Sequence, residues 1–210
     1  MAEPAELYDA ILTGNAKKAE EVTKAALEAG ANPSDLLGQH MIPAMDEVGR
    51  RFECNEYFVP ELLIAARAMK TALGLLTPKL AEIGAKAAGQ VVIGTVQGDL
   101  HDIGKNLVAS MLEGGGFQVT DLGVDVPAEK FIEEVKDKDG AIIALSALLT
   151  TTMTQMKAVV EALEAAGLRE KVKVIIGGAP ITQQYCDEIG ADGYSDNASA
   201  AVGLARNLAG

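Results

Sequence analysis

Residues 89–210 alternate five short apolar runs with stretches that have helical spacing, and this alternation constrains the fold more than any other feature. Parallel strands need a crossover between them, usually a helix, and such crossovers are right-handed in nearly all cases. We therefore predict an α/β fold with a doubly wound, five-stranded parallel sheet of the Rossmann-like or flavodoxin-like kind. The predicted strands are VVIGTV (91–96), FQVTDLG (117–123), GAIIALS (140–146), VKVIIGG (172–178) and a short one near ADGYS (191–195).

Residues 4–85 have helical spacing only. Leu7 and Ile11 share one helical face, and a break is expected at Gly14–Asn15. A new helix is expected to start at Asn32 or Ser34, because both side chains can cap a helix. We predict three to four short helices that form a small bundle.

The small-residue stretch GAKAAGQ (84–90) separates the two patterns and is typical of a flexible linker. The sequence therefore predicts two domains: a helical domain over residues 1–88 and an α/β domain over residues 89–210.

The net charge of −12 argues against a nucleic-acid partner and against an anionic membrane surface. No apolar run reaches the roughly 18 residues that cross a bilayer, and MAEPAELYDA lacks the layout of a signal peptide. Cys54 and Cys186 stand alone, outside any CxxC motif. We expect a cytoplasmic, reducing setting in which both thiols are half-buried.

The turns that follow the predicted strands are rich in Gly, Ser, Thr and Asp, and such turns form the ligand-binding edge of an α/β sheet. The first of them, QGDLHDIG, does not match the phosphate-binding templates. Five residues separate Gly98 from Gly104, and Asn106 follows Lys105, so the Walker A pattern is absent. The glycines also miss the spacing of a dinucleotide fingerprint.

His101, one of only two histidines, lies in this first turn. A metal-binding histidine commonly donates its other ring N–H to a carboxylate, and Asp99 is suitably placed. One histidine and one carboxylate cannot close a zinc site. A lone histidine ligand makes better sense if a macrocycle supplies the other ligands. From spacing alone, His101 as a helix cap or as a general base stays equally open.

Several segments resemble a known family. Gly98–Gly104 matches the DxHxxG motif of corrinoid-binding domains, SALLTTT (146–152) resembles their SxL segment, and GGAP (177–180) resembles their GG turn. Residues 45–73 resemble the helical cap module of cobalamin-dependent methionine synthase. The whole chain is still more similar to the small free-standing corrinoid proteins of methylotrophic methyltransferase systems.

The resemblance implies a cobalamin or related corrinoid bound base-off, with His101 as the lower axial ligand of cobalt. Asp99 matches the carboxylate that hydrogen-bonds this histidine, and Thr152 matches the hydroxyl that completes the relay. Thr152 could instead cap the following helix. The other positions that match cofactor-contacting residues are Gly98, Ile103, Gly104, Ser146, Leu148, Thr150, Gly177, Gly178, Ala198, Phe52 and Val59.

Within that set, Ser146, Leu148 and Thr150 match the lining of the slot for the nucleotide tail. Phe52 and Val59 match positions that face the cobalt-bound methyl group, although both residues, with Phe58, could equally be bundle core. Asp102 is expected at a helix start.

The function implied by the resemblance is that of a corrinoid carrier, methylated in its loaded state. It would shuttle the methyl group from a substrate-specific methyltransferase to a second one that serves coenzyme M or tetrahydrofolate, with a reductive activase as a third partner. His101 would bind and leave cobalt in each turnover. A cobalamin-dependent sensor and the corrinoid subunit of a mutase are the alternatives, and the helical cap module favours the carrier. The methyl donor stays open among methanol, methylamines, betaines and methoxylated aromatics.

Overall fold

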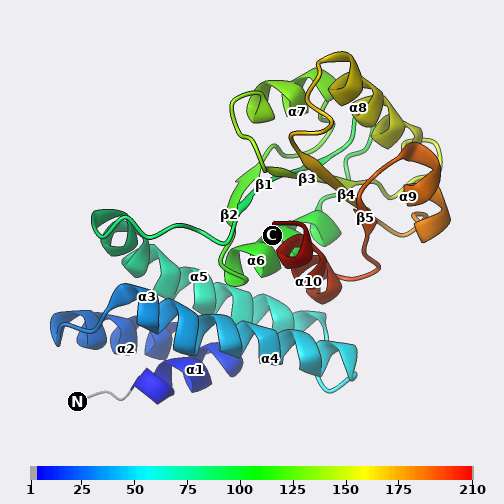
Figure 1. Ribbon diagram of the computed structural model, residues 1–210. Helices are drawn as coiled ribbons and strands as arrows, with labels where there is room; N and C mark the ends of the chain where they lie inside the picture. Colours follow the sequence, from blue (N-terminus) through cyan, green and yellow to red (C-terminus); the bar gives the residue numbers. More distant parts are fainter. Residues whose placement is uncertain (1–3, 210) are drawn as a thin grey trace. The chain divides into compact units, whose positions relative to one another are not determined.

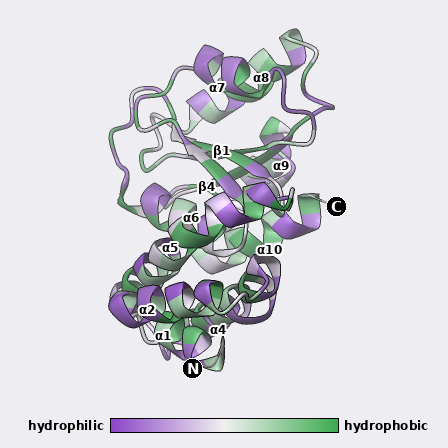
Figure 2. Cartoon of the chain, turned by 90° about the vertical axis from the view of Figure 1, so that its left-hand side faces the viewer, coloured by the Kyte–Doolittle hydropathy of each residue, from purple (hydrophilic) through white to green (hydrophobic). Residues whose placement is uncertain are grey.

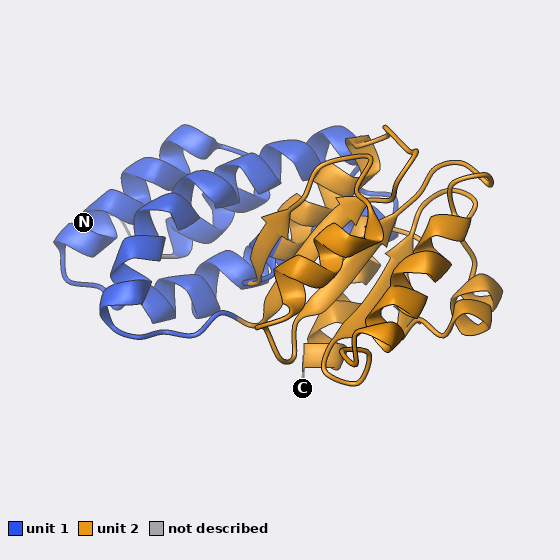
Figure 3. Ribbon diagram, turned by 90° about the horizontal axis from the view of Figure 1, so that it is seen from above, with its two compact units in different colours: residues 1–87, 113–116 blue, residues 88–112, 117–210 orange. Residues whose placement is uncertain are grey.

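The computed structural model describes residues 4–209, which divide into two compact units (Figure 3). The first unit covers the residues up to Ala87 together with Glu113–Gly116. The second covers Ala88–Leu112 and the residues from Phe117 onward.

Over residues 4–87, the first unit holds four helical segments, as the sequence predicts. Three of them contain a single helix each. The third segment in the chain is continuous from residue 33 to residue 53 and contains a π-helical turn. The elements are α1 (Pro4–Leu12), α2 (Ala16–Glu28), α3 (Pro33–Leu36), η1 (Leu37–Met41), α4 (Ile42–Glu53) and α5 (Val59–Glu82).

Local capping explains the helix boundaries in this unit. Gly14 has a φ of +72°, and Asn15 caps α2 by accepting a hydrogen bond from Lys18 N–H. Asn32, one of the two predicted caps, accepts from Ser34 N–H at 2.9 Å. The π-helical turn lies next to Pro43, which cannot donate to the preceding turn and whose ring crowds it, so the wider turn accommodates the proline without ending the helix.

The second unit holds, across its described residues, a five-stranded sheet in the order β2-β1-β3-β4-β5, with every pairing parallel. The predicted fold class is confirmed. The ends of the strands differ from those of the predicted runs by at most two residues. Their bounds are β1 (Gln90–Thr95), β2 (Gln118–Asp121), β3 (Ile142–Ser146), β4 (Lys173–Gly177) and β5 (Gly193–Tyr194).

Helices cover both faces of this sheet (Figure 1). One face carries α7 (Ala128–Val135), α8 (Thr154–Ala165) and α9 (Gln183–Ile189), and the other carries α6 (Ile103–Gly114) and α10 (Ala198–Ala209). Hydrophobic residues, drawn in green in Figure 2, run along the strands, whereas the helices are mixed.

The main core of the second unit lies between the sheet and α7, α8 and α9. The fully buried Phe131 ring needs Gly94 opposite it, because a Cβ at Gly94 would lie 2.7 Å from the ring.

The register of the sheet aligns the residues from which the candidate site starts. Thr95 at the end of β1 pairs with Ser146 at the end of β3, and Ser146 pairs with Gly177 at the end of β4. The three turns that follow these residues therefore leave the sheet at the same level.

The cysteine prediction is wrong for both residues. Cys54 is exposed, because it follows the last residue of α4 in a loop. Cys186 lies on the buried face of α9, among the core residues. Among the helices that the structure describes, none has the length and apolar character required to cross a bilayer.

Candidate functional site

The carboxylate of Asp99 is the centre of the site at the end of β1. The residue has no exposed surface, and within residues 4–209 four donors point at it. Its Oδ1 accepts from the main-chain N–H of His101 at 3.0 Å and lies 2.8 Å from His101 Nδ1. Its Oδ2 accepts from Leu148 N–H at 2.8 Å and from the Thr152 hydroxyl at 2.7 Å. Both oxygens are thus engaged, one with each of two loops.

Two opposing effects set the pKa of Asp99. Burial raises the pKa, but the hydrogen bonds from Leu148 N–H, His101 N–H, the Thr152 hydroxyl and the His101 ring favour the charged form and outweigh burial. The net result is a pKa well below the ordinary aspartate value. Asp99 is therefore ionised at neutral pH.

The ionised carboxylate determines the tautomer of His101. An ionised carboxylate only accepts hydrogen bonds, so the proton of the neutral imidazole must sit on Nδ1. Nε2 then carries the free lone pair. The His101 side chain is 53% exposed, so this lone pair is available to a ligand outside the chain.

The Nδ1 atom of His101 faces Asp99, so this nitrogen is not available to cap a helix, which is one of the predicted alternatives. Asp102 lies directly before α6, as expected, and its carbonyl accepts from Asn106 N–H at 2.7 Å.

No group of three or more His, Cys, Asp or Glu side chains that could hold a metal ion occurs among the described residues. A metal bound at His101 must therefore bring its other ligands with it.

The last residue of β3 and the β3–α8 loop together hold four of the predicted residues. Leu148 contributes its main-chain N–H to Asp99, while its side chain is 42% exposed. Thr152 is buried and uses its hydroxyl on Asp99, so it does not cap α8, whose N-cap residue is Met153. Ser146 is half-buried at the strand end, and Thr150 is exposed.

The loops at this edge of the sheet carry exposed apolar side chains. Every large apolar side chain that is exposed in the described part of the second unit follows β1, β2 or β3 at the carboxyl edge of the sheet. The set consists of Leu100 (72% exposed), Ile103 (79%), Val124 (36%), Leu148 (42%) and Leu149 (43%). We call this set the apolar rim. Its position at the ligand edge of the sheet offers an apolar surface that a bound ligand could cover.

The predicted glycines differ in what requires them. Gly98 has a φ of +80° and Gly178 a φ of +134°, and a Cβ at Gly178 would lie 1.9 Å from the Ala147 carbonyl oxygen. A Cβ at Gly177 would lie 3.2 Å from the Ser195 carbonyl oxygen. Packing and backbone conformation within the protein account for these three glycines.

Gly104 has no such explanation. It is the second residue of α6, its φ is not positive, and a Cβ there would meet nothing within 4 Å. A glycine costs helix stability at such a position. The open space beside it is consistent with the close approach of a ligand.

Ala198, predicted to contact the cofactor, is the first residue of α10 and is 5% exposed. Its side chain packs inward, so it offers little surface for a ligand. Asn197 accepts from Ala200 N–H at 2.8 Å and so caps this helix.

Phe52 and Val59 belong to the first unit. Phe52 is half-buried near the end of α4, and Val59 is 41% exposed at the start of α5, next to Phe58 at 59%. Val59 and Phe58 are therefore not part of the core of the helical bundle, which was one of the two alternatives for them.

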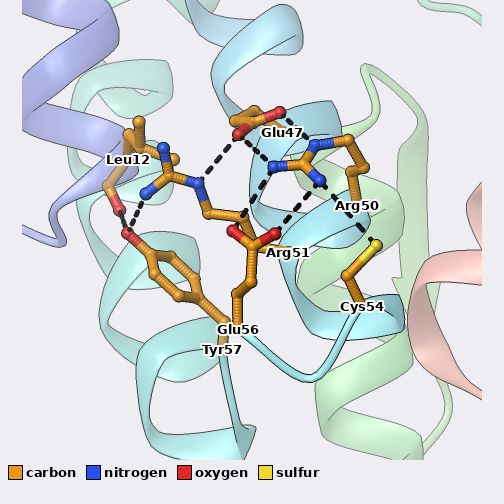
Figure 4. A network of polar contacts seen from close by, with 7 residues as sticks. All are labelled: Leu12, Glu47, Arg50, Arg51, Cys54, Glu56 and Tyr57. Atoms are coloured by element: carbon orange, nitrogen blue, oxygen red, sulfur yellow. Dashed lines mark hydrogen bonds and ion pairs between the residues drawn. The ribbon is translucent and has the colours of Figure 1, made fainter.

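An ion-pair network holds the loop that leads to these residues (Figure 4). Glu47 pairs with Arg50 at 2.7 Å and with Arg51 at 2.8 Å. Hydrogen bonds first from Arg50 and then from Arg51 lower the pKa of Glu47 to about 2. Arg51 also donates to the Tyr57 hydroxyl at 3.0 Å, and that hydroxyl donates to the Leu12 carbonyl at 3.2 Å. The start of α5 is therefore fixed to α4 and α1.

Sequence reasoning missed several residues of the site. Leu100, Val124 and Leu149 of the apolar rim were not singled out, although apolar side chains in glycine-rich turns are a usable signal. Thr95 and Asp125, which hydrogen-bond the main chain around His101, were also missed. Nothing in the local sequence distinguishes these two from ordinary strand and turn residues.

Comparison with known proteins identifies two family matches, both described as B12 binding domains, over residues 89–203 and 5–77. The chain is 44% identical over 200 residues to the trimethylamine corrinoid protein of Methanosarcina barkeri, covering 94% of this chain and 92% of that protein. It is 43% identical over 203 residues to dimethylamine corrinoid protein 3 of Methanosarcina acetivorans, covering 97% and 95%.

Among solved structures, the chain is similar to the methanol:cobalamin methyltransferase complex MtaBC from Methanosarcina barkeri. The TM-score is 0.85 at 31% identity, and the match covers 97% of this chain and 78% of that chain.

The Asp99→Asn variant tests the carboxylate. An amide has one acceptor oxygen, so at least one buried donor loses its partner, and the free energy of unfolding at pH 7 should fall by about 1–3 kcal/mol. Because the folded-state pKa of Asp99 is lowered, its stabilising effect is present above the ordinary pKa of about 3.9 and is lost as the pH falls. Between about pH 5 and pH 3, the stability of the variant should therefore fall less steeply than that of the unmodified chain.

Urea unfolding at several pH values measures both effects. Asp102→Asn is the matched control, since it makes the same change on an exposed side chain and should shift stability by less than about 0.5 kcal/mol. If the free energy of unfolding changed equally with pH in Asp99→Asn and in the unmodified chain, the lowered pKa of Asp99 would be contradicted.

Proposed function

The chain belongs to the B12-binding protein family, and from this premise we propose that it carries a methyl group on a bound corrinoid between two methyltransferases. The observation that carries the proposal is the Asp99–His101 pair, which leaves one exposed imidazole lone pair at the ligand edge of the sheet. The nearly full-length similarity to trimethylamine and dimethylamine corrinoid proteins supports it.

We propose that His101 is the lower axial ligand of cobalt. Asp99 would hold the ring by Nδ1, place the lone pair of the neutral imidazole on Nε2 and make the imidazole a better electron-pair donor. Thr152 and Leu148 N–H would keep the carboxylate charged and in place. A bound corrinoid supplies a cobalt centre that accepts a methyl group from one partner and releases it to another.

The apolar rim would contact the lower side of the macrocycle and exclude water from His101. Leu100 and Ile103 flank the histidine in sequence and expose most of their side chains, which an apolar ligand would cover. Gly104 would leave room for the closest approach.

The partners we propose are a substrate-specific methyltransferase, an acceptor methyltransferase and a reductive activase. The similarity to a methyltransferase complex supports the first. Methylated amines are the donor class we favour. The relatives named for trimethylamine and dimethylamine are 44% and 43% identical to this chain, whereas the methanol system is 31% identical.

The direct test is a methyl-loading assay. The purified chain is reconstituted with cobalamin, reduced, and mixed with methyltransferases for trimethylamine, dimethylamine, monomethylamine and methanol, each with its substrate. We expect methyl loading, followed by visible absorption, to be fastest with one of the amine enzymes. Loading by the methanol enzyme alone would contradict the donor class, and failure to retain corrinoid would contradict the function itself.

Gly104→Ala separates binding from folding. Alanine is favoured over glycine in a helix by up to about 1 kcal/mol, so the free energy of unfolding of the corrinoid-free chain should stay equal or rise. Steric conflict of about 1–3 kcal/mol with a closely packed ligand should raise the Kd for cobalamin about tenfold or more. Gly203→Ala in α10, where a Cβ also meets nothing within 4 Å, is the matched control. Equal Kd values for the two variants would show that Gly104 does not approach the cofactor.

A further inference from the structure

Thr95 and Asp125 hold the main chain on both sides of Asp99 and His101. The hydrogen bonds of both residues go to the main chain of this segment, and the role proposed above does not use them. They come from the end of β1 and from the β2–α7 loop. Thr95 bonds one main-chain group of the segment from Gly98 to His101, and Asp125 bonds two.

Asp125 exchanges two hydrogen bonds with this segment. Its Oδ1 accepts from Gly98 N–H at 2.7 Å, and its own N–H donates to the Asp99 carbonyl at 3.0 Å. Asp125 has a φ of +54°, a conformation that is uncommon outside glycine, asparagine and aspartate. In this conformation, the carboxylate and the main-chain N–H of Asp125 both face the main chain of Gly98 and Asp99.

The loop that presents Asp125 is itself fixed. At its start, Asp121 pairs with the buried ammonium group of Lys105 in α6 and accepts from Gly123 N–H at 2.9 Å. Further along, Thr95 N–H donates to the Gly123 carbonyl, and Val126 N–H donates to the Thr95 carbonyl, both at 3.0 Å. Asp125 is thus presented by a rigid support.

Thr95 is fully buried, and its hydroxyl donates to the His101 carbonyl at 2.8 Å. His101 is therefore held at its N–H and at Nδ1 by Asp99 and at its C=O by Thr95. Nε2 is left free to face a ligand.

We propose that Thr95 and Asp125 are positioning residues that keep the His101 loop in the conformation from which Nε2 binds cobalt. This inference rests on the proposed function. A loop that is fixed in advance loses less conformational entropy when the ligand binds. The fixed conformation therefore raises the fraction of chains in which the His101 imidazole is bound to cobalt.

The test compares two pairs of variants in the full-length chain. Thr95→Val removes the hydroxyl at nearly constant volume, and Thr95→Ser keeps it. Asp125→Gly removes the acceptor while favouring the positive φ, and Asp125→Asn keeps an acceptor and tolerates that φ. Thermal unfolding of each variant first checks that all four fold, and only folded variants are compared.

The first measurement needs no corrinoid. Amide hydrogen exchange of His101 and Leu148, which both donate to Asp99, should be about tenfold faster in Thr95→Val and in Asp125→Gly, a factor that corresponds to about 1.4 kcal/mol. Thr95→Ser and Asp125→Asn should restore slow exchange. Val174 N–H, which donates to Asp192 at the opposite edge of the sheet, is the internal control and should not change.

The second measurement is the visible spectrum of the methylcobalamin-loaded chain at one fixed pH. Thr95→Val and Asp125→Gly should retain corrinoid but shift toward the spectrum of His101→Ala, and the conservative variants should match the unmodified chain. Unchanged exchange and unchanged spectra in both disruptive variants would overturn the inference. If the unmodified chain and His101→Ala share one spectrum, ligation by His101 is contradicted instead, and amide exchange alone decides whether these residues position the loop.

Discussion

The buried, ionised carboxylate of Asp99 is the interaction on which the rest of the site depends. A buried charge is tolerated only when hydrogen bonds replace the water it has lost. Here both oxygens are occupied by donors from two loops, so the charge, the loop conformation and the histidine tautomer are set together. Removing any one donor would affect the other three.

The sheet order explains why one carboxylate can join these loops. β1 lies between β2 and β3, so the His101 loop is flanked by the loops that follow both neighbours. The β3–α8 loop supplies Leu148 N–H and Thr152, and the β2–α7 loop supplies Asp125. In sheets with this strand order, ligands bind where the order reverses between β1 and β3. His101 stands at that point.

The sequence was sufficient to predict the alternating fold and to select His101, because both follow from local patterns. Asp99 was predicted from its spacing to His101, Thr152 was predicted from the resemblance, and the structure brings both of them to the His101 loop. The contributions of Leu148 N–H, Thr95 and Asp125 could not be predicted, since each depends on which loops meet in space. Ala198 was expected to contact the cofactor, yet it is nearly buried, because it belongs to the face of α10 that packs inward.

The central claim is that His101 binds cobalt through Nε2, and electron paramagnetic resonance of the cobalt(II) form tests it most directly. The chain has two histidines, so a His40→Ala background labelled with ¹⁵N-histidine leaves His101 as the sole labelled imidazole. The account predicts that the label changes the nitrogen splitting of the cobalt lines, since ¹⁴N and ¹⁵N differ in nuclear spin. A spectrum with identical splitting from labelled and unlabelled protein would contradict it.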